Sequence, residues 1–209
     1  MNSLSEQSIV KIFYSSLLAA ITWFALVLQL ILTKGSVVNY FSYFTILCNL
    51  LIAASLTFLS FFPRSKPGQF FSRPSVQTAI ALYIFIVGLV YNVVLRGLYV
   101  FSGWQWIVDN MLHVVVPLFY LLYWILFTPK GTLKWQDGIH WIFFPFGYLI
   151  YSLIRGAVVA WYPYPFLDVV KHGYAKVFIN IGLMIAVFFI TGLLIIAADR
   201  VINSKKKSQ

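Results

Sequence analysis

Long apolar runs separated by short polar segments dominate this chain. Six of the runs are long enough to cross the roughly 30 Å hydrocarbon core of a bilayer as helices of about 20 residues. They lie near Ile9–Leu32, Tyr40–Phe62, Ser75–Val100, Trp106–Phe127, Ile139–Ala160 and Tyr174–Ala198. The connections between them are too short to fold as a separate soluble domain. The pattern therefore predicts an all-α membrane protein in which residues 1–209 form a single six-helix transmembrane bundle.

The composition supports the same class of protein. Hydrophobic residues make up 61% of the 209 residues and charged residues 10%, and the mean hydropathy is +0.88. These values lie outside the range of soluble globular domains. The first span is longer than the apolar core of a signal peptide and no small-residue cleavage pattern accompanies it, so we expect it to stay attached.

The formal net charge of +10 follows the pattern of a multi-pass membrane protein rather than that of a nucleic-acid-binding protein. If alternate connections lie on one side, that side carries Arg64, Lys66, Arg73, Lys130, Lys134, Arg200, Lys205, Lys206 and Lys207. Only Lys34 and Lys171 fall in the opposite connections, with Lys176 at the start of span six. Because basic residues gather on the cytoplasmic side, we expect both termini in the cytoplasm and no nucleic-acid partner.

The sequence indicates neither a disulfide within the chain nor a metal site. Cys48 is the single cysteine, so no disulfide can form within the chain. His113, His140 and His172 are scattered over different segments, and no cluster of His, Cys, Asp and Glu residues at ligand spacing occurs. We therefore expect neither a bound metal nor a cofactor.

Span four carries an acid, an amide and an imidazole within an apolar helix. Asp109 and His113 are spaced i,i+4, and Asn110 and His113 are spaced i,i+3, so all three lie on one stripe of the helix. Ionisable residues inside a membrane mark a functional site by default, because they are costly without a partner or a polar cavity. The alternative is that His113 is a structural histidine that holds helices together through hydrogen bonds.

Three other spans carry polar pairs or cations. Thr45 and Asn49 are i,i+4 neighbours in span two, Asn92 and Arg96 are i,i+4 neighbours in span three, and Arg155 lies in span five. Each has an ordinary alternative: a threonine can bond a carbonyl one turn earlier, and an arginine can extend to the headgroups. Given the directions of the spans, however, all these residues and the span-four group fall in the outer half of the membrane. The coincidence predicts one shared polar cavity open to the outer leaflet or the outer water.

Two chemistries fit such a cavity. In the first, His113 removes the proton from the Thr45 hydroxyl, Asp109 or Asn110 orients the imidazole, and Asn49, Asn92 or an arginine stabilises the oxyanion of an ester under attack. In the second, Arg96 and Arg155 bind an anionic headgroup or carboxylate and His113 titrates during transport, without a covalent step.

A family resemblance favours the first chemistry. The segment Tyr40–Leu51 with Thr45, His113 followed by Pro117, and the loop Trp161-Tyr-Pro-Tyr-Pro-Phe166 resemble the androgen-induced-gene family of six-span membrane proteins. The resemblance implies hydrolysis of fatty acid esters of hydroxy fatty acids, with Thr45 and His113 at the positions of the family's catalytic threonine and histidine. The whole chain looks closer still to a bacterial six-span family with no assigned activity, which implies the bacterial plasma membrane.

Two features depart from the eukaryotic relatives. Asp109 stands where an asparagine-like residue is expected, and Arg96 and Arg155 have no counterpart in the family's pattern. The extra positive charge suggests a more anionic lipid than a neutral ester. We therefore expect an intramembrane lipid-ester hydrolase, with a non-catalytic lipid-binding, anion-binding or transport protein as the alternative. In either case the expected partner is a membrane lipid or lipid ester.

Overall fold

The computed structural model describes the backbone of residues 2–98 and 100–207, and side chains within residues 9–98 and 100–201. Over these residues it contains helices and no β-strand. Six helical segments are long and apolar enough to span a membrane: Ile9–Leu32, Phe44–Phe61, Pro74–Leu95, Gly103–Phe127, Trp135–Val159 and Val169–Val201. They bear out the prediction of an all-helical, multi-pass membrane protein.

Several span ends differ from the prediction by a few residues, and two of these differences have a clear local cause. The second span begins at Phe44 rather than Tyr40, because a short helix α2 (Val37–Phe41) precedes it and the chain turns at Ser42 before α3 (Phe44–Phe61) begins. The third span ends at Leu95 rather than Val100. There Arg96 adopts an extended conformation (φ −61°, ψ 126°) and Gly97 a φ of +90°, which glycine adopts without the steric cost of a side chain.

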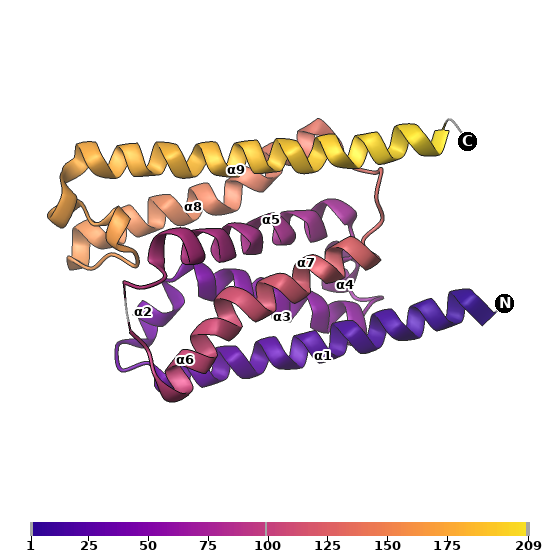
Figure 1. Ribbon diagram of the computed structural model, residues 1–209, viewed down its shortest axis with the longest axis horizontal. Coiled ribbons are helices and arrows are strands. Elements are labelled where there is room, and N and C mark those ends of the chain that lie inside the picture. The colour runs from indigo at the N-terminus through magenta and orange to yellow at the C-terminus, as the bar shows by residue number, and fades with distance from the viewer. Residues whose placement is uncertain (1, 99, 208–209) are drawn as a thin grey trace. The chain divides into compact units, whose positions relative to one another are not determined.

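The helices fall into two compact units, Met1–Pro129 and Lys130–Gln209. In the first unit, α1 packs against α3 and α7, and α5 packs against the same two helices (Figure 1). The helices of this unit not yet introduced are α1 (Asn2–Leu32), α4 (Lys66–Phe71), α5 (Pro74–Val90), η1 (Tyr91–Leu95), α6 (Gly103–Asn110), η2 (Met111–Val115) and α7 (Val116–Phe127). Here η1 and η2 are π-helical segments that continue α5 and join α6 to α7.

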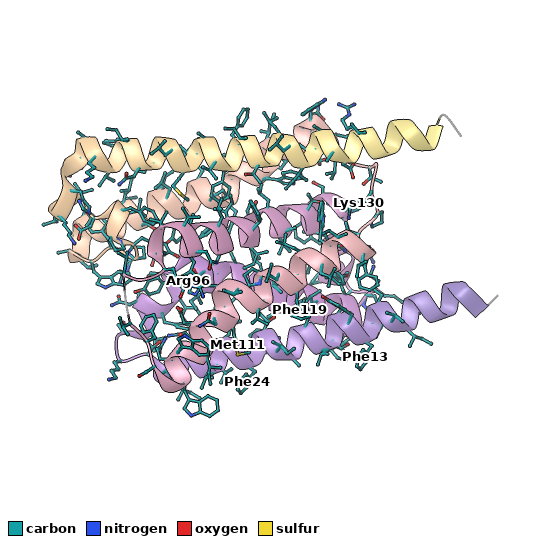
Figure 2. The ribbon with its side chains drawn as sticks, in the orientation of Figure 1. Phe13, Phe24, Arg96, Met111, Phe119 and Lys130 are labelled. Atoms are coloured by element: carbon teal, nitrogen blue, oxygen red, sulfur yellow. The ribbon has the colours of Figure 1, made fainter. Side chains whose placement is uncertain are left out.

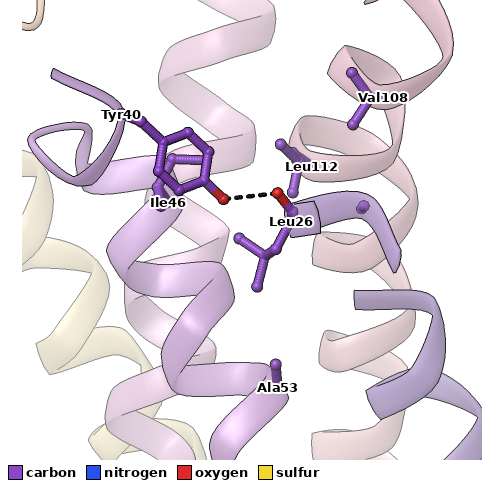
Figure 3. Close-up of a cluster of buried hydrophobic side chains, with 7 residues drawn as sticks. Leu26, Tyr40, Ile46, Ala53, Val108 and Leu112 are labelled. Carbon is purple, nitrogen blue, oxygen red and sulfur yellow. Dashed lines mark hydrogen bonds between the residues drawn. The ribbon is translucent and has the colours of Figure 1, made fainter. Parts of the chain in front are cut away.

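A buried apolar cluster holds α1, α2, α3 and the α6–η2 segment together (Figure 3). Its members are Ala25, Leu26, Tyr40, Ile46, Ala53, Val108 and Leu112. The Tyr40 hydroxyl donates a 2.8 Å hydrogen bond to the Leu26 carbonyl, so this buried polar atom is satisfied by the neighbouring helix. The cluster fixes the start of α3, where Thr45 lies, against the segment that carries His113.

The opposite end of the first unit is joined by polar side chains. The Trp124 indole donates a 2.9 Å hydrogen bond to Thr78, and the Thr128 hydroxyl donates a 2.6 Å bond to the side-chain carbonyl of Gln77. Hydrogen bonds between helices replace part of the hydrophobic driving force that lipid does not supply. Large apolar side chains such as Phe13 and Phe24 on α1 are instead exposed, as expected of surfaces that face lipid (Figure 2).

The second unit consists of α8 (Trp135–Val159), the 3₁₀ turn η3 (Pro165–Leu167) and α9 (Val169–Lys207), with a break in α9 at Gly173 (φ +74°). The buried carboxylate of Asp199 accepts hydrogen bonds from the backbone N–H groups of Gly131 (2.7 Å) and Leu133 (2.9 Å). Burial lowers the pKa of Lys130 in the same loop to about 8, and the nearby Asp199 charge opposes that shift. That all six spans form one bundle stays a prediction.

Candidate active site

Two π-helical segments form the framework of the site. In η1 the Arg96 N–H donates to the Tyr91 carbonyl, and in η2 the Val116 N–H donates to the Met111 carbonyl, both across five residues. Each segment also has a side chain that donates to the carbonyl four residues before it: Asn92 to Gly88 (2.7 Å), and the His113 ring to Asp109 (2.8 Å). Side-chain groups inserted into the helical hydrogen-bond ladder are a known cause of such distortions, which often occur at functional sites.

Thr45 and His113 lie against each other across α3 and η2. The Thr45 hydroxyl oxygen is 3.3 Å from Nε2 of His113. Thr45 is buried, with 7% of its surface exposed, and 15% of the His113 side chain is exposed. The prediction that these two side chains face one another is confirmed, and their separation is slightly longer than the 2.6–3.2 Å expected of an engaged nucleophile and base, as is common before substrate binds.

The surroundings of His113 determine which ring nitrogen carries its proton. Nδ1 lies 2.8 Å from the backbone carbonyl oxygen of Asp109, which can only accept a hydrogen bond. Nδ1 must therefore be the protonated nitrogen, and in the neutral ring Nε2 is left as an acceptor. The Thr45 hydroxyl then donates to Nε2, which is the arrangement required of a nucleophile and its general base.

The Asp109 carboxylate supports the imidazole from the same side. Its Oδ1 lies 3.2 Å from Nδ1 of His113, and its Oδ2 accepts a hydrogen bond from the Tyr91 hydroxyl. The Tyr91 ring also stacks on the His113 ring, with centroids 4.0 Å apart and planes inclined by 13°. A carboxylate in this position stabilises the positive charge that the ring gains when it takes a proton. Thr45, His113, Asp109 and Tyr91 thus form one connected group, which we call the Thr45–His113 site.

Close helix packing allows Tyr91 to reach His113. Gly88, one turn before Tyr91 on α5, faces the His113 carbonyl and Pro117, and a β-carbon added at Gly88 would lie 3.4 Å from that carbonyl oxygen. Small residues allow close approach of membrane helices. Pro117 has no N–H to offer the His113 carbonyl, which favours the departure from α-helical bonding in η2.

Asn49 holds the two sides of the site together. Its amide nitrogen donates to the Thr45 carbonyl (2.8 Å) on its own helix and to the Leu112 carbonyl (3.2 Å) on η2. Both amide hydrogens are therefore engaged, and in this arrangement Asn49 is a brace between α3 and η2 rather than an oxyanion donor. Its side-chain oxygen is buried and has no hydrogen-bond partner in the described structure.

The other residues predicted for the site contact groups other than Thr45 and His113. Asn110 donates to the Trp106 carbonyl of its own helix, so of the two residues expected to orient His113 it is Asp109 that does so. Asn92 accepts a 2.7 Å hydrogen bond from Arg96, as their spacing predicted, and both are exposed at the end of the third span. Arg155 belongs to the second unit, where its guanidinium lies over the Trp161 ring, 4.6 Å from the centroid.

Sequence reasoning missed Tyr91 and Gly88. Tyr91 directly precedes Asn92, at the depth already assigned to the site, and Gly88 stands one turn before Asn92. The two residues thus lay within a segment marked by the Asn92–Arg96 pair, but a tyrosine near a membrane interface usually indicates only an aromatic belt. The stacking on His113 depends on the packing of α5 against η2, which no local spacing reveals.

No protein family model, curated protein or solved structure matches this chain. The site is therefore interpreted from its own geometry: a threonine hydroxyl, an imidazole of defined tautomer and a carboxylate, arranged in that order. This arrangement can activate a hydroxyl for attack on a carbonyl carbon.

Proposed function

We propose that this protein is an intramembrane lipid-ester hydrolase in which Thr45 is the nucleophile and His113 the general base. One observation carries the proposal: the Thr45 hydroxyl lies 3.3 Å from Nε2 of His113 while Nδ1 is bound to the Asp109 carbonyl. In this arrangement Nε2 is the atom that can accept the Thr45 proton, and Nδ1 is held by a neighbouring acceptor, as a general base requires. The resemblance of the Thr45 and His113 segments to the androgen-induced-gene family agrees with this chemistry.

Acylation follows from the geometry. As the Thr45 oxygen attacks the ester carbonyl carbon, its proton passes to Nε2 of His113, and the Asp109 carboxylate stabilises the imidazolium. The tetrahedral intermediate then collapses, the bond between the carbonyl carbon and the alcohol oxygen breaks, and Nε2 returns the proton to the leaving alcohol. The products of this half-reaction are the free alcohol and an acyl ester on Thr45.

Deacylation uses the same groups with water as the nucleophile. His113 takes a proton from the water as its oxygen attacks the acyl carbon, and then returns that proton to the Thr45 oxygen as the acyl bond breaks. The fatty acid is released and Thr45 is regenerated. In both half-reactions, the second amide hydrogen of Asn92 is the candidate to stabilise the oxyanion, since Asn49 has both hydrogens engaged.

The proposal includes a location for the site. The basic residues concentrated in alternate connections favour cytoplasmic termini, which puts the end of the first unit that carries Thr45 and His113 in the outer leaflet. The resemblance to the bacterial family implies a bacterial plasma membrane. A cysteine introduced at Ser65 tests the orientation, because the native Cys48 is buried. Reaction of that cysteine with an impermeant reagent in intact cells would contradict it.

Turnover of lipid esters tests the activity. The purified protein is incubated with a panel of neutral, zwitterionic and anionic lipid esters, and the released fatty acid is measured for the wild type, Thr45→Ala and His113→Ala. Thr57→Ala is a matched control, because it makes the same change on α3 at a hydroxyl that bonds Ala53 and Trp23. We expect near-complete loss in both site variants, as in other catalytic units, and wild-type turnover in the control. Turnover that survives Thr45→Ala would contradict the proposal.

The alternative is a protein that binds or transports an anionic lipid without chemistry. The observation that favours it is the exposed guanidinium of Arg96, which Asn92 holds in position. This alternative gives the Thr45 to His113 contact only a structural role, and for that reason we rank it second.

A further inference from the structure

Arg96 is a cation held next to the Thr45–His113 site. Its backbone N–H closes the last turn of η1 by donating to the Tyr91 carbonyl at 2.7 Å, and Tyr91 stacks on His113. The Tyr91 hydroxyl in turn binds the Asp109 carboxylate, and Figure 2 shows Arg96 at the same end of the first unit as Met111, where η2 begins. The guanidinium therefore belongs to the same end of the first unit as the Thr45 hydroxyl.

The Arg96 side chain has a fixed anchor and unused donors. Its Nη1 donates to Asn92, which in turn donates to the Gly88 carbonyl, both at 2.7 Å. This chain of bonds ties the guanidinium to α5 and uses one of its five N–H groups. No carboxylate among the described side chains forms an ion pair with it. An oriented guanidinium without an acidic partner is suited to bind a phosphate or carboxylate through two parallel hydrogen bonds.

Apolar surface surrounds this cation. Val93, Val94 and Leu98, on either side of Arg96 in the sequence, have 73%, 50% and 55% of their surface exposed. A soluble anion gains nothing from apolar neighbours, whereas a lipid covers them with its acyl chain while its headgroup meets the guanidinium. The chemistry of the surface therefore selects an anionic amphiphile.

We propose that the substrate is an anionic lipid ester whose headgroup phosphate or carboxylate is bound by Arg96 while its ester carbonyl is presented to Thr45. The inference rests on the proposed function and adds the substrate class. Asn92 serves as the positioning residue that keeps the guanidinium directed, and Arg96→Lys retains the charge without the planar pair of donors.

Arg73 provides a matched comparison. It lies at the opposite end of the same helix, where it caps the start of α5, and is likewise exposed. Its guanidinium lies over the Phe70 ring, 5.8 Å from the centroid, and it is far along the helix from Tyr91. If any arginine at a membrane surface attracted anionic lipid equally, Arg73→Gln and Arg96→Gln would have the same effect.

Binding is measured first in Thr45→Ala protein, so that no turnover intervenes. The protein, in phosphatidylcholine nanodiscs, is titrated with fluorescent phosphatidylglycerol and with phosphatidylcholine carrying the same chains and dye. Arg96→Gln, Arg96→Lys, Asn92→Ala and Arg73→Gln are compared in that background, and inorganic phosphate is added as a competitor. Ester turnover of the two lipids is then measured with Thr45 restored.

We expect phosphatidylglycerol to bind roughly ten-fold more tightly than phosphatidylcholine, the worth of one hydrogen-bonded charge pair. Arg96→Gln should abolish that preference, Arg96→Lys and Asn92→Ala should reduce it, and Arg73→Gln should leave it intact. Equal affinity for the two lipids, or equal effects of Arg73→Gln and Arg96→Gln, would overturn the inference, as would displacement of the lipid by millimolar inorganic phosphate.

The two proposals fail in distinguishable ways. Binding that depends on Arg96 without any ester turnover would overturn the hydrolase and leave an anionic-lipid site. Turnover that depends on Thr45 but shows no preference for the anionic lipid would keep the hydrolase and overturn the substrate class.

Discussion

Tyr91 and His113 belong to different π-helical segments, yet their rings stack with centroids 4.0 Å apart. The hydroxyl of the same tyrosine donates a hydrogen bond to Oδ2 of Asp109, and Oδ1 of that carboxylate lies 3.2 Å from Nδ1 of His113. One residue of α5–η1 thus restrains both the imidazole and the carboxylate that supports it. Tyr91 therefore acts as a positioning residue for the base.

Replacing Tyr91 separates its two contacts. Tyr91→Phe keeps the ring and removes the bond to Asp109, so kcat for lipid-ester hydrolysis should fall roughly ten-fold, about the net value of one hydrogen bond to a charged group, with KM unchanged. Tyr91→Leu also removes the stacking and should reduce kcat further. Steady-state kinetics of the two variants would contradict this role if KM rose while kcat stayed the same.

Asp109→Asn should cost less than His113→Ala. The His113 tautomer is held by the Asp109 backbone carbonyl, which the substitution leaves in place. Only the charge that stabilises the imidazolium is lost, so kcat should fall roughly ten- to hundred-fold. In His113→Ala, by contrast, it should fall to the uncatalysed rate. The ¹⁵N spectrum of the His113 ring, with His140 and His172 replaced by Gln, should still report a protonated Nδ1 in the variant. A switch to protonated Nε2 would show that the carboxylate, not the carbonyl, sets the tautomer.

The close approach of α5 to η2 at Gly88 is also testable. An added β-carbon would make ordinary contacts at 3.4 and 3.5 Å, so Gly88→Ala should be tolerated. Gly88→Leu forces the helices apart, and overpacking of this kind should destabilise the protein by about 1–3 kcal/mol. Thermal unfolding in detergent measures both variants. Equal stability of Gly88→Leu and the wild type would mean that α5 does not pack against Pro117 as described.

The hydrogen bonds to the Asp199 carboxylate should be the main contribution to the stability of the loop that precedes α8. Asp199→Ala leaves the backbone N–H groups of Gly131 and Leu133 without their acceptor, at a cost of about 2–4 kcal/mol. It should also lower the pKa of Lys130 below its value of about 8, because the opposing charge is gone. Asp137→Ala is the control: it removes the exposed bond to the Lys134 N–H, and loss of such a helix cap should cost about 1 kcal/mol. Equal unfolding free energies for the two variants would contradict the assignment.

The helices were predictable because apolar length alone specifies a membrane span. Local spacing also identified the Thr45, Asp109 and His113 segments, since a polar group inside an apolar helix needs a partner. The roles of Asn49 and Asn110 were harder to assign, because each amide bonds a carbonyl one turn earlier on its own helix. Nothing in a helical pattern distinguishes such an amide from one directed at a ligand. The two π-helical segments, which turn Tyr91 and His113 toward each other, depend on tertiary packing and were not predicted.

Covalent labelling of Thr45 tests the central claim most directly. The purified protein is treated with a fluorophosphonate probe, and the site of the adduct is mapped by mass spectrometry in the wild type, Thr45→Ala, His113→Ala and the control Thr57→Ala. If His113 activates the Thr45 hydroxyl, the adduct should lie on Thr45 in the wild type and Thr57→Ala, and should be absent from the other two variants. An adduct on another residue, or labelling of Thr45 that persists in His113→Ala, would contradict the account.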